Sequence, residues 1–174
     1  MPDSRSILYS AGRNDECYTP SYVVEAIEPY LPKGKVIWCP FDLEDSAFVR
    51  VLRGAGHEVV HSHRDTGQDY FHYEPTRWDL MLSNPPFTGK REVFARALSF
   101  GKPFGLLMTL TWLNDSAPKD LFAGRDLQLF LFRDRIRFLD RDGTPLSDRI
   151  TFASAFYCCD LLPRQIIIHN AHQR

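Results

Sequence analysis

The sequence predicts an α/β fold in which a mostly parallel sheet is closed by an antiparallel hairpin near the C-terminus. The first observation is that short apolar runs alternate with longer amphipathic segments, which is typical of parallel strands joined by helices. The second is the turn signal Asp142-Gly143 between the last two apolar runs, which predicts the hairpin. No repeat or linker interrupts the pattern, so we expect one domain over residues 1–174.

Each expected strand is a short apolar run, and each expected helix has apolar residues at helical spacing. The segment 45–56 illustrates the helical pattern, because Ala47, Phe48 and Leu52 share one face. Gly56 can end that helix. The strands are expected at 35–39, 57–62, 78–83, 103–113, 127–132 and 151–159, and the helices at 45–56, 90–101 and 115–124.

Composition narrows the class of protein. Apolar residues make up 44% and charged residues 25% of the chain, which is usual for a globular protein. No secretory signal and no apolar run of about 20 residues is visible, so a cytoplasmic location is expected. The four cysteines form no C-x-x-C pair, and we expect no metal site. Residues 88–174 hold 13 Lys/Arg against 9 Asp/Glu, which permits a nucleic-acid-binding face.

The stretch "LMLSNPPF" contains the strongest chemical signal. An apolar run stops at Asn84, and Pro85 and Pro86 have no N–H with which to continue a central strand. The carboxyl ends of parallel strands are where ligands bind in such sheets. The Asn84 side-chain oxygen and the Pro85 carbonyl can accept the two N–H groups of a conjugated amine, and this frees the nitrogen lone pair for attack. Phe87 offers a flat surface on which an extruded base can stack.

These residues resemble a known family. "NPPF" is similar to the (Asp/Asn/Ser)-Pro-Pro-(Tyr/Phe) motif of S-adenosylmethionine-dependent amino-methyltransferases, and "YTP" at 18–20 resembles a second signature of the adenine-specific DNA enzymes. The resemblance covers roughly residues 14–160 and implies a Rossmann-like class I methyltransferase fold. It further implies S-adenosylmethionine as cofactor and methylation of the exocyclic N6 amine of adenine, with DNA favoured.

The resemblance also implies the residues of the site. The catalytic loop comprises Asn84, Pro85, Pro86 and Phe87. The cofactor contacts are Tyr18, Thr19, Pro20, Pro40, Phe41, Asp42, Asp69, Tyr70 and Asn84, and the substrate contacts are Phe87, Lys90, Arg135 and Arg137. We expect no separate target-recognition domain, so the resemblance suggests relaxed specificity, a partner protein that supplies target specificity, or a phage or mobile-element context.

The chain departs from the family pattern at two strand ends. In the family the first strand ends in an acidic residue, and here Cys39 takes that position. In the family the second strand also ends in an acidic residue, which binds the cofactor ribose, and here no acidic residue ends that strand. The candidates for a contact to the methionine amine are Asp42, Glu44 and Asp45, and the second strand offers His61 or His63.

Other interpretations remain open at this stage. "NPPF" is also compatible with a stiff turn, and Thr19 and Pro20 with the N-cap and first residue of a helix. Arg135 and Arg137 alternate with apolar residues, as on the solvent face of a strand. The alternative functions are methylation of RNA adenine or of protein glutamine, and a methyltransferase-like module that binds nucleic acid or a partner without catalysis.

Overall fold

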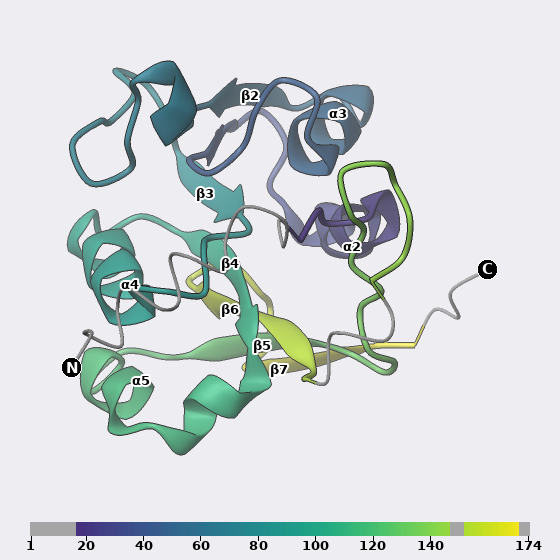
Figure 1. Cartoon of the computed structure of the whole chain (residues 1–174). Coiled ribbons are helices and arrows are strands. Elements are labelled where there is room, and N and C mark those ends of the chain that lie inside the picture. The colour runs from purple at the N-terminus through teal and green to yellow at the C-terminus, as the bar shows by residue number, and fades with distance from the viewer. Residues whose placement is uncertain (1–16, 147–151, 171–174) are drawn as a thin grey trace, which may run out of the picture.

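A computed structural model describes residues 17–146 and 152–170. Within them one seven-stranded sheet has the strand order β2-β1-β3-β4-β6-β5-β7 (Figure 1). Only β6 runs against its neighbours, since every other pair in the sheet is parallel. The mostly parallel α/β class and the antiparallel pairing of the two predicted final strands are therefore confirmed. The strands are β1 (Val36–Cys39), β2 (Glu58–His61), β3 (Leu80–Ser83), β4 (Phe104–Thr109), β5 (Gln128–Phe132), β6 (Ser154–Cys159) and β7 (Ile166–His169).

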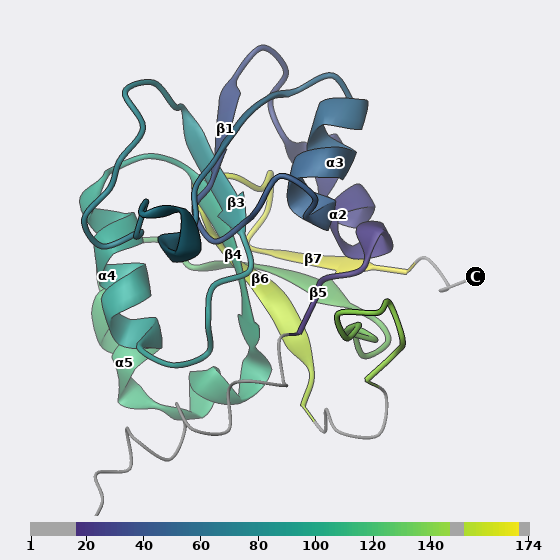
Figure 2. The same ribbon diagram turned by 45° about the horizontal axis from the view of Figure 1, so that its top comes forward.

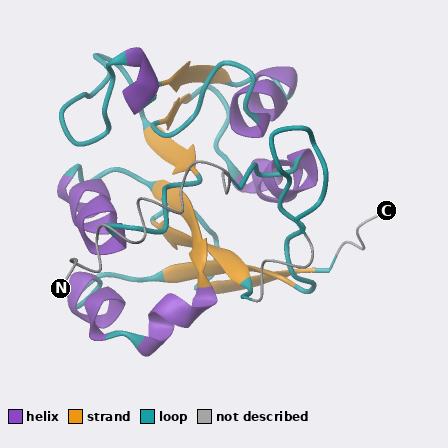
Figure 3. Ribbon diagram, viewed as in Figure 1, coloured by secondary structure: helices purple, strands orange, loops and turns teal. Residues whose placement is uncertain are grey.

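Helices cover both faces of the sheet, which gives three layers (Figures 2 and 3). On one face lie α2 (Ser21–Ile27) and α3 (Ala47–Gly54), and on the other α4 (Lys90–Ser99) and α5 (Ser116–Leu121). Short 3-10 helices lie at Glu28–Tyr30, Arg64–Thr66 and Leu110–Asn114. No helix in the described part of the chain is long and apolar enough to cross a membrane.

The core consists of two apolar clusters, one on each face of the sheet. In β3, Leu80 and Leu82 pack toward α2 and α3, whereas Met81 packs toward α4. Every residue of β1, β3, β4 and β6 is buried. A strand buried on both faces has a continuous apolar sequence, and this explains why these four runs are easy to recognise.

Three details differ from the predictions. The expected strand 103–113 ends at Thr109, because the Thr109 side chain accepts a hydrogen bond from the Thr111 N–H and starts a 3-10 helix. The capping interpretation of Thr19 is wrong: α2 begins at Ser21 after Pro20, and no side chain caps it. Strand β7, which pairs with β5, was not predicted. Residue 151 of the expected last strand lies outside the described residues.

Candidate functional site at the carboxyl ends of β1 and β3

The loop after β1 is fastened to the end of the neighbouring strand β3. Ser83, the last residue of β3, is fully buried, and its hydroxyl donates to Asp42 Oδ2. The Ser83 hydroxyl oxygen in turn accepts a hydrogen bond from the Phe41 N–H at 3.3 Å. Since β1 and β3 are adjacent parallel strands, these bonds hold the two loops side by side.

Asn84, directly after Ser83, is bonded to the N-terminal motif. Its Nδ2 donates to Thr19 Oγ1 at 3.1 Å, across 65 residues of sequence. Its Oδ1 is buried and has no hydrogen-bond partner. An amide nitrogen only donates and an amide oxygen only accepts. The bond to Thr19 therefore leaves the acceptor atom of Asn84 available for a ligand donor.

The rest of the predicted catalytic loop leads into α4. Pro85 is buried and Pro86 is exposed, while Phe87 is half-buried. The Phe87 ring makes an edge-to-face contact with Phe152, with centroids 5.4 Å apart. Gly89 precedes the helix with a φ of 67°, a left-handed conformation that favours glycine.

The segment that contains Tyr18 pairs with the chain beyond β5. The Tyr18 N–H donates to the Leu139 carbonyl at 2.8 Å, and the Leu139 N–H donates back at 2.9 Å. In the same region the Arg137 N–H donates to the Tyr22 hydroxyl at 3.0 Å. The predicted "YTP" and "DRIRF" stretches are thus neighbours in space, although more than 100 residues separate them.

The predicted substrate residues differ in their exposure. Arg135 and Arg137 are exposed, whereas the intervening Ile136 and the following Phe138 are buried. Lys90 is half-buried and is the first residue of α4, three positions after Phe87.

Asp42 is an unusual carboxyl group, since its residue is only 6% exposed. Burial raises its pKa to about 6, against the opposing effects of hydrogen bonds from Ser83 and Ser46 and of the positive charge of His61. Near neutral pH most molecules still hold a carboxylate there. A buried negative charge beside the predicted catalytic loop is a suitable partner for a cationic ligand group.

Aromatic residues lie next to this carboxylate. The Phe41 and Tyr70 rings are 4.7 Å apart, and the buried Tyr70 hydroxyl donates to the Val93 carbonyl at 3.0 Å. Asp69 is half-buried, and its Oδ1 accepts from the Phe71 N–H at 2.8 Å. The structure therefore places Phe41 and Tyr70 together, with Asp69 at their border. Pro20 and Pro40 are buried in the adjoining turns.

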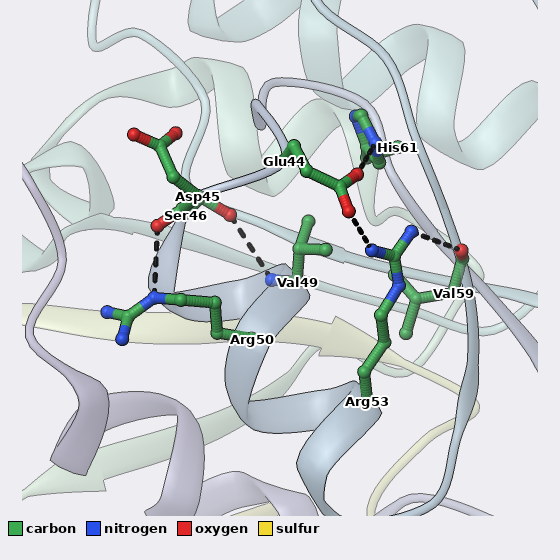
Figure 4. Close-up of polar contacts among 8 residues, drawn as sticks. All are labelled: Glu44, Asp45, Ser46, Val49, Arg50, Arg53, Val59 and His61. Carbon is green, nitrogen blue, oxygen red and sulfur yellow. Dashed lines mark hydrogen bonds and ion pairs between the residues drawn. The ribbon is translucent and has the colours of Figure 1, made fainter.

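A second carboxylate lies at the end of β2 (Figure 4). Glu44, from the loop after β1, binds Arg53, and its Oε2 is 2.6 Å from Nε2 of His61, the last residue of β2. The Arg53 hydrogen bond, followed by that of His61, lowers the pKa of Glu44. Sequence reasoning named Glu44 and His61 as separate alternatives, and it had no signal that they bind each other.

Asp45, the third candidate carboxylate, is exposed, and its backbone carbonyl accepts from Arg50 Nε at 3.0 Å. Ser46 caps α3 by accepting a hydrogen bond from the Val49 N–H at 3.2 Å. Figure 4 shows these bonds beside the Glu44 cluster.

No protein-family model and no curated protein matches the chain. Among solved structures, the methyltransferase subunit of a type I restriction-modification system from Streptococcus thermophilus aligns with a TM-score of 0.49 and 11% identity, over 87% of this chain and 46% of that one. A predicted O-methyltransferase from Agrobacterium tumefaciens aligns with a TM-score of 0.39 and 10% identity, over 82% of each chain. The chain thus spans less than half of the first protein. At these values the likeness assigns no activity, and the fold class rests on the sheet order itself.

Proposed function

We propose that the protein is an S-adenosylmethionine-dependent methyltransferase that methylates the N6 amine of adenine in DNA. The main support is the hydrogen bond between Asn84 and Thr19, which joins the two motifs. It orients the Asn84 amide so that its acceptor oxygen lacks a protein partner.

The chemistry needs two acceptors at the amine. One N–H donates to Asn84 Oδ1 and the other to the Pro85 carbonyl, so the nitrogen lone pair is withdrawn from the ring and becomes nucleophilic. The cofactor supplies an electrophilic methyl carbon on its sulfonium. Asn84 and Pro85 would hold the amine towards this methyl group, and the proton that the amine loses on methylation would go to solvent. Phe87 supplies the stacking surface for the extruded base.

The residues around the strand ends fit the cofactor. Asp42 offers a buried negative charge for the methionine ammonium group, and the half-buried Phe41, packed on the buried Tyr70, offers an aromatic surface for the adenine ring. Glu44, held by His61 at the end of β2, offers a carboxylate for the ribose hydroxyls. A carboxylate that binds ribose hydroxyls beside a parallel sheet is a recurrent feature of nucleotide sites.

DNA is the proposed substrate because exposed basic side chains lie on the segment that adjoins "YTP". Arg135 and Arg137 can neutralise phosphates there, and Lys90 stands near the catalytic loop. Phosphate contacts of this kind orient a duplex without reading its sequence.

The test is a transfer assay with methyl-labelled S-adenosylmethionine and duplex DNA, RNA or protein as acceptor. We expect N6-methyladenine in digested DNA, formed about 10²–10³-fold more slowly by Asn84→Ala. Asn170→Ala, an exposed asparagine beyond β7, is the matched control and should retain full activity. If the label appears only in RNA or only on protein glutamine, that acceptor, and not DNA, is the substrate. No transfer despite cofactor binding would favour a non-catalytic binding module.

A further inference from the structure

Few buried polar side-chain atoms in the described residues lack a hydrogen-bond partner. They are His57 Nδ1, Asn84 Oδ1, Arg96 Nε and Ser154 Oγ. Asn84 belongs to the proposed catalytic loop, whereas Ser154 has no role in the proposed function. Ser154 is the first residue of β6 and is 4% exposed.

Asn84 and Ser154 lie on the same face and at the same end of the sheet. Ser154 is paired with Thr109, the last residue of β4, and Ser83 is paired with Leu106, three residues before Thr109. Leu82 and Phe156, each two positions from one of the pair, pack in the cluster beside α2 and α3. Residues two apart in a strand share a face, so Ser154 faces that cluster. Asn84 lies just past the end of β3, and its amide donates to Thr19, which precedes α2 on that side of the sheet. Since β4 alone separates β3 from β6, the two strands are roughly 10 Å apart.

Ser154 is also connected to the loop expected to stack the base. Phe152, two residues before it, contacts the Phe87 ring. Phe87 itself packs against the cluster beside α4 and α5, whereas Ile136 and Phe138 of the "DRIRF" stretch belong to the cluster beside α2 and α3. The Ser154 hydroxyl therefore lies among segments to which the proposed function gives substrate contacts.

Other buried hydroxyls near these strand ends have partners. Ser83 donates to Asp42, the Ser62 hydroxyl accepts from Trp38 Nε1 at 3.0 Å, and the Thr109 and Thr111 hydroxyls are 2.8 Å apart. A buried hydroxyl without a partner destabilises the folded state, and alanine at that position would remove the penalty. A buried polar group that lacks a hydrogen bond, against the usual rule, is characteristic of a functional site.

We infer that Ser154 contacts the substrate, and that its hydroxyl donates a hydrogen bond to a ring nitrogen of the purine whose amine Asn84 binds. The inference rests on the proposed function and adds a residue that reads the base. Because Ser154 is 4% exposed, base entry has to displace the side chains that now cover it. An unprotonated purine nitrogen accepts such a bond, and a carbon at that position does not.

The first experiment compares stability with activity in Ser154→Ala. We expect the melting temperature to rise by about 2–4 °C, because an unpartnered buried group is removed. The methylation rate should fall roughly tenfold, the factor for one lost hydrogen bond. Ser62→Ala, which removes a bonded hydroxyl, should instead melt lower, and the exposed Ser99→Ala should change neither quantity. Ser154→Ala with full methylation activity would overturn the inference.

The second experiment identifies the contact atom. Duplexes that contain 1-deaza-, 3-deaza- or 7-deazaadenine at the target are compared with adenine. Wild type should lose about tenfold on the one analogue that lacks the bonded nitrogen. Ser154→Ala should methylate adenine and that analogue equally. If Ser154→Ala and wild type lose activity by the same factor on each analogue, the inference is wrong, but the proposed function is not affected. A wild-type protein that methylates no adenine would overturn both.

Discussion

Asn84 has two amide atoms with opposite hydrogen-bonding character, and Thr19 determines which of them can serve a ligand. The hydroxyl of Thr19 accepts from Nδ2, so Oδ1 is the atom left for an amine. In the proposed function, Thr19 is therefore a positioning residue from another segment. The motif containing Asn84 was recognisable from sequence because its four residues are contiguous. The partnership with Thr19 was expected only in general terms, since it depends on how distant segments fold together.

Replacing Asn84 tests the proposed chemistry directly. We expect Asn84→Ala to lower the methylation rate by about 10²–10³-fold, because one preorganised hydrogen-bond group is lost. Asn84→Asp retains an acceptor oxygen and should keep part of the activity. Single-turnover kinetics measure the rate, and calorimetry with S-adenosylmethionine should show little change in affinity. If Asn84→Ala methylates at the wild-type rate, Asn84 does not activate the amine, and "NPPF" is only a stiff turn.

Asp42 should make stability and cofactor binding depend on pH. Burial raises its folded pKa from 3.8 to about 6, so between these values the folded protein binds more protons than the unfolded chain. Stability from this group therefore falls as pH rises through that window, by on the order of 3 kcal/mol in total. Asparagine does not titrate. Asp42→Asn should consequently gain stability relative to wild type between pH 4 and pH 7, as measured by urea unfolding.

The pH dependence that Asp42 gives to cofactor binding is opposite to the one that it gives to stability. A cationic ligand group beside Asp42 favours the carboxylate, so affinity for S-adenosylmethionine should weaken as pH falls below about 6. Asp42→Asn should bind weakly at every pH, and the exposed Asp45→Asn should behave like wild type. Wild-type affinity that is constant from pH 5 to pH 8 would remove Asp42 from the cofactor site.

At the scale of elements, strands buried on both faces could be predicted from the sequence. Strand β7, which depends on pairing with a strand distant in sequence, could not. The runs that became β1, β3, β4 and β6 are continuously apolar because both faces are covered. Strand β7 has only four residues, of which Ile166 and Ile168 are exposed, and its order comes from pairing with β5. A local pattern contains little information about such a pairing. The contact between Glu44 and His61 was inaccessible from sequence for the same reason.

Gly105 in β4 shows how closely the elements pack. A Cβ built there would lie 3.0 Å from Leu82 Cδ1, 3.1 Å from Leu161 Cδ2 and 3.2 Å from Cys158 Sγ. We expect Gly105→Ala to destabilise the protein by about 1–3 kcal/mol, since an overpacked core has to shift. Gly54→Ala is the control: no heavy atom lies within 4 Å of its Cβ position, and alanine favours a helix by about 0.5–1 kcal/mol. Urea unfolding that ranks the two variants equally would contradict the packing argument.

At the scale of the whole molecule, the fold gathers basic residues from the second half of the chain near the carboxyl ends of the strands. The net charge is −1, so attraction to a polyanion requires a local concentration of positive side chains. Arg135 and Arg137 meet this requirement because their segment is tied to Tyr18 and Tyr22. The sequence showed the charge asymmetry, whereas the three-dimensional contacts relate it to the proposed catalytic loop.

The salt dependence of DNA binding tests this arrangement. If both arginines neutralise phosphates, Arg135→Gln with Arg137→Gln should reduce the log–log salt slope by up to about 1.8, which is 0.9 per phosphate on duplex DNA. Lys35→Gln with Arg77→Gln removes the same charge just before β1 and β3, at the opposite end of the sheet, and should leave the slope unchanged. Fluorescence anisotropy over 50–200 mM salt measures both slopes. Equal slopes for the two double variants would mean that net charge alone attracts the DNA, and a wild-type slope of zero would instead favour a protein substrate.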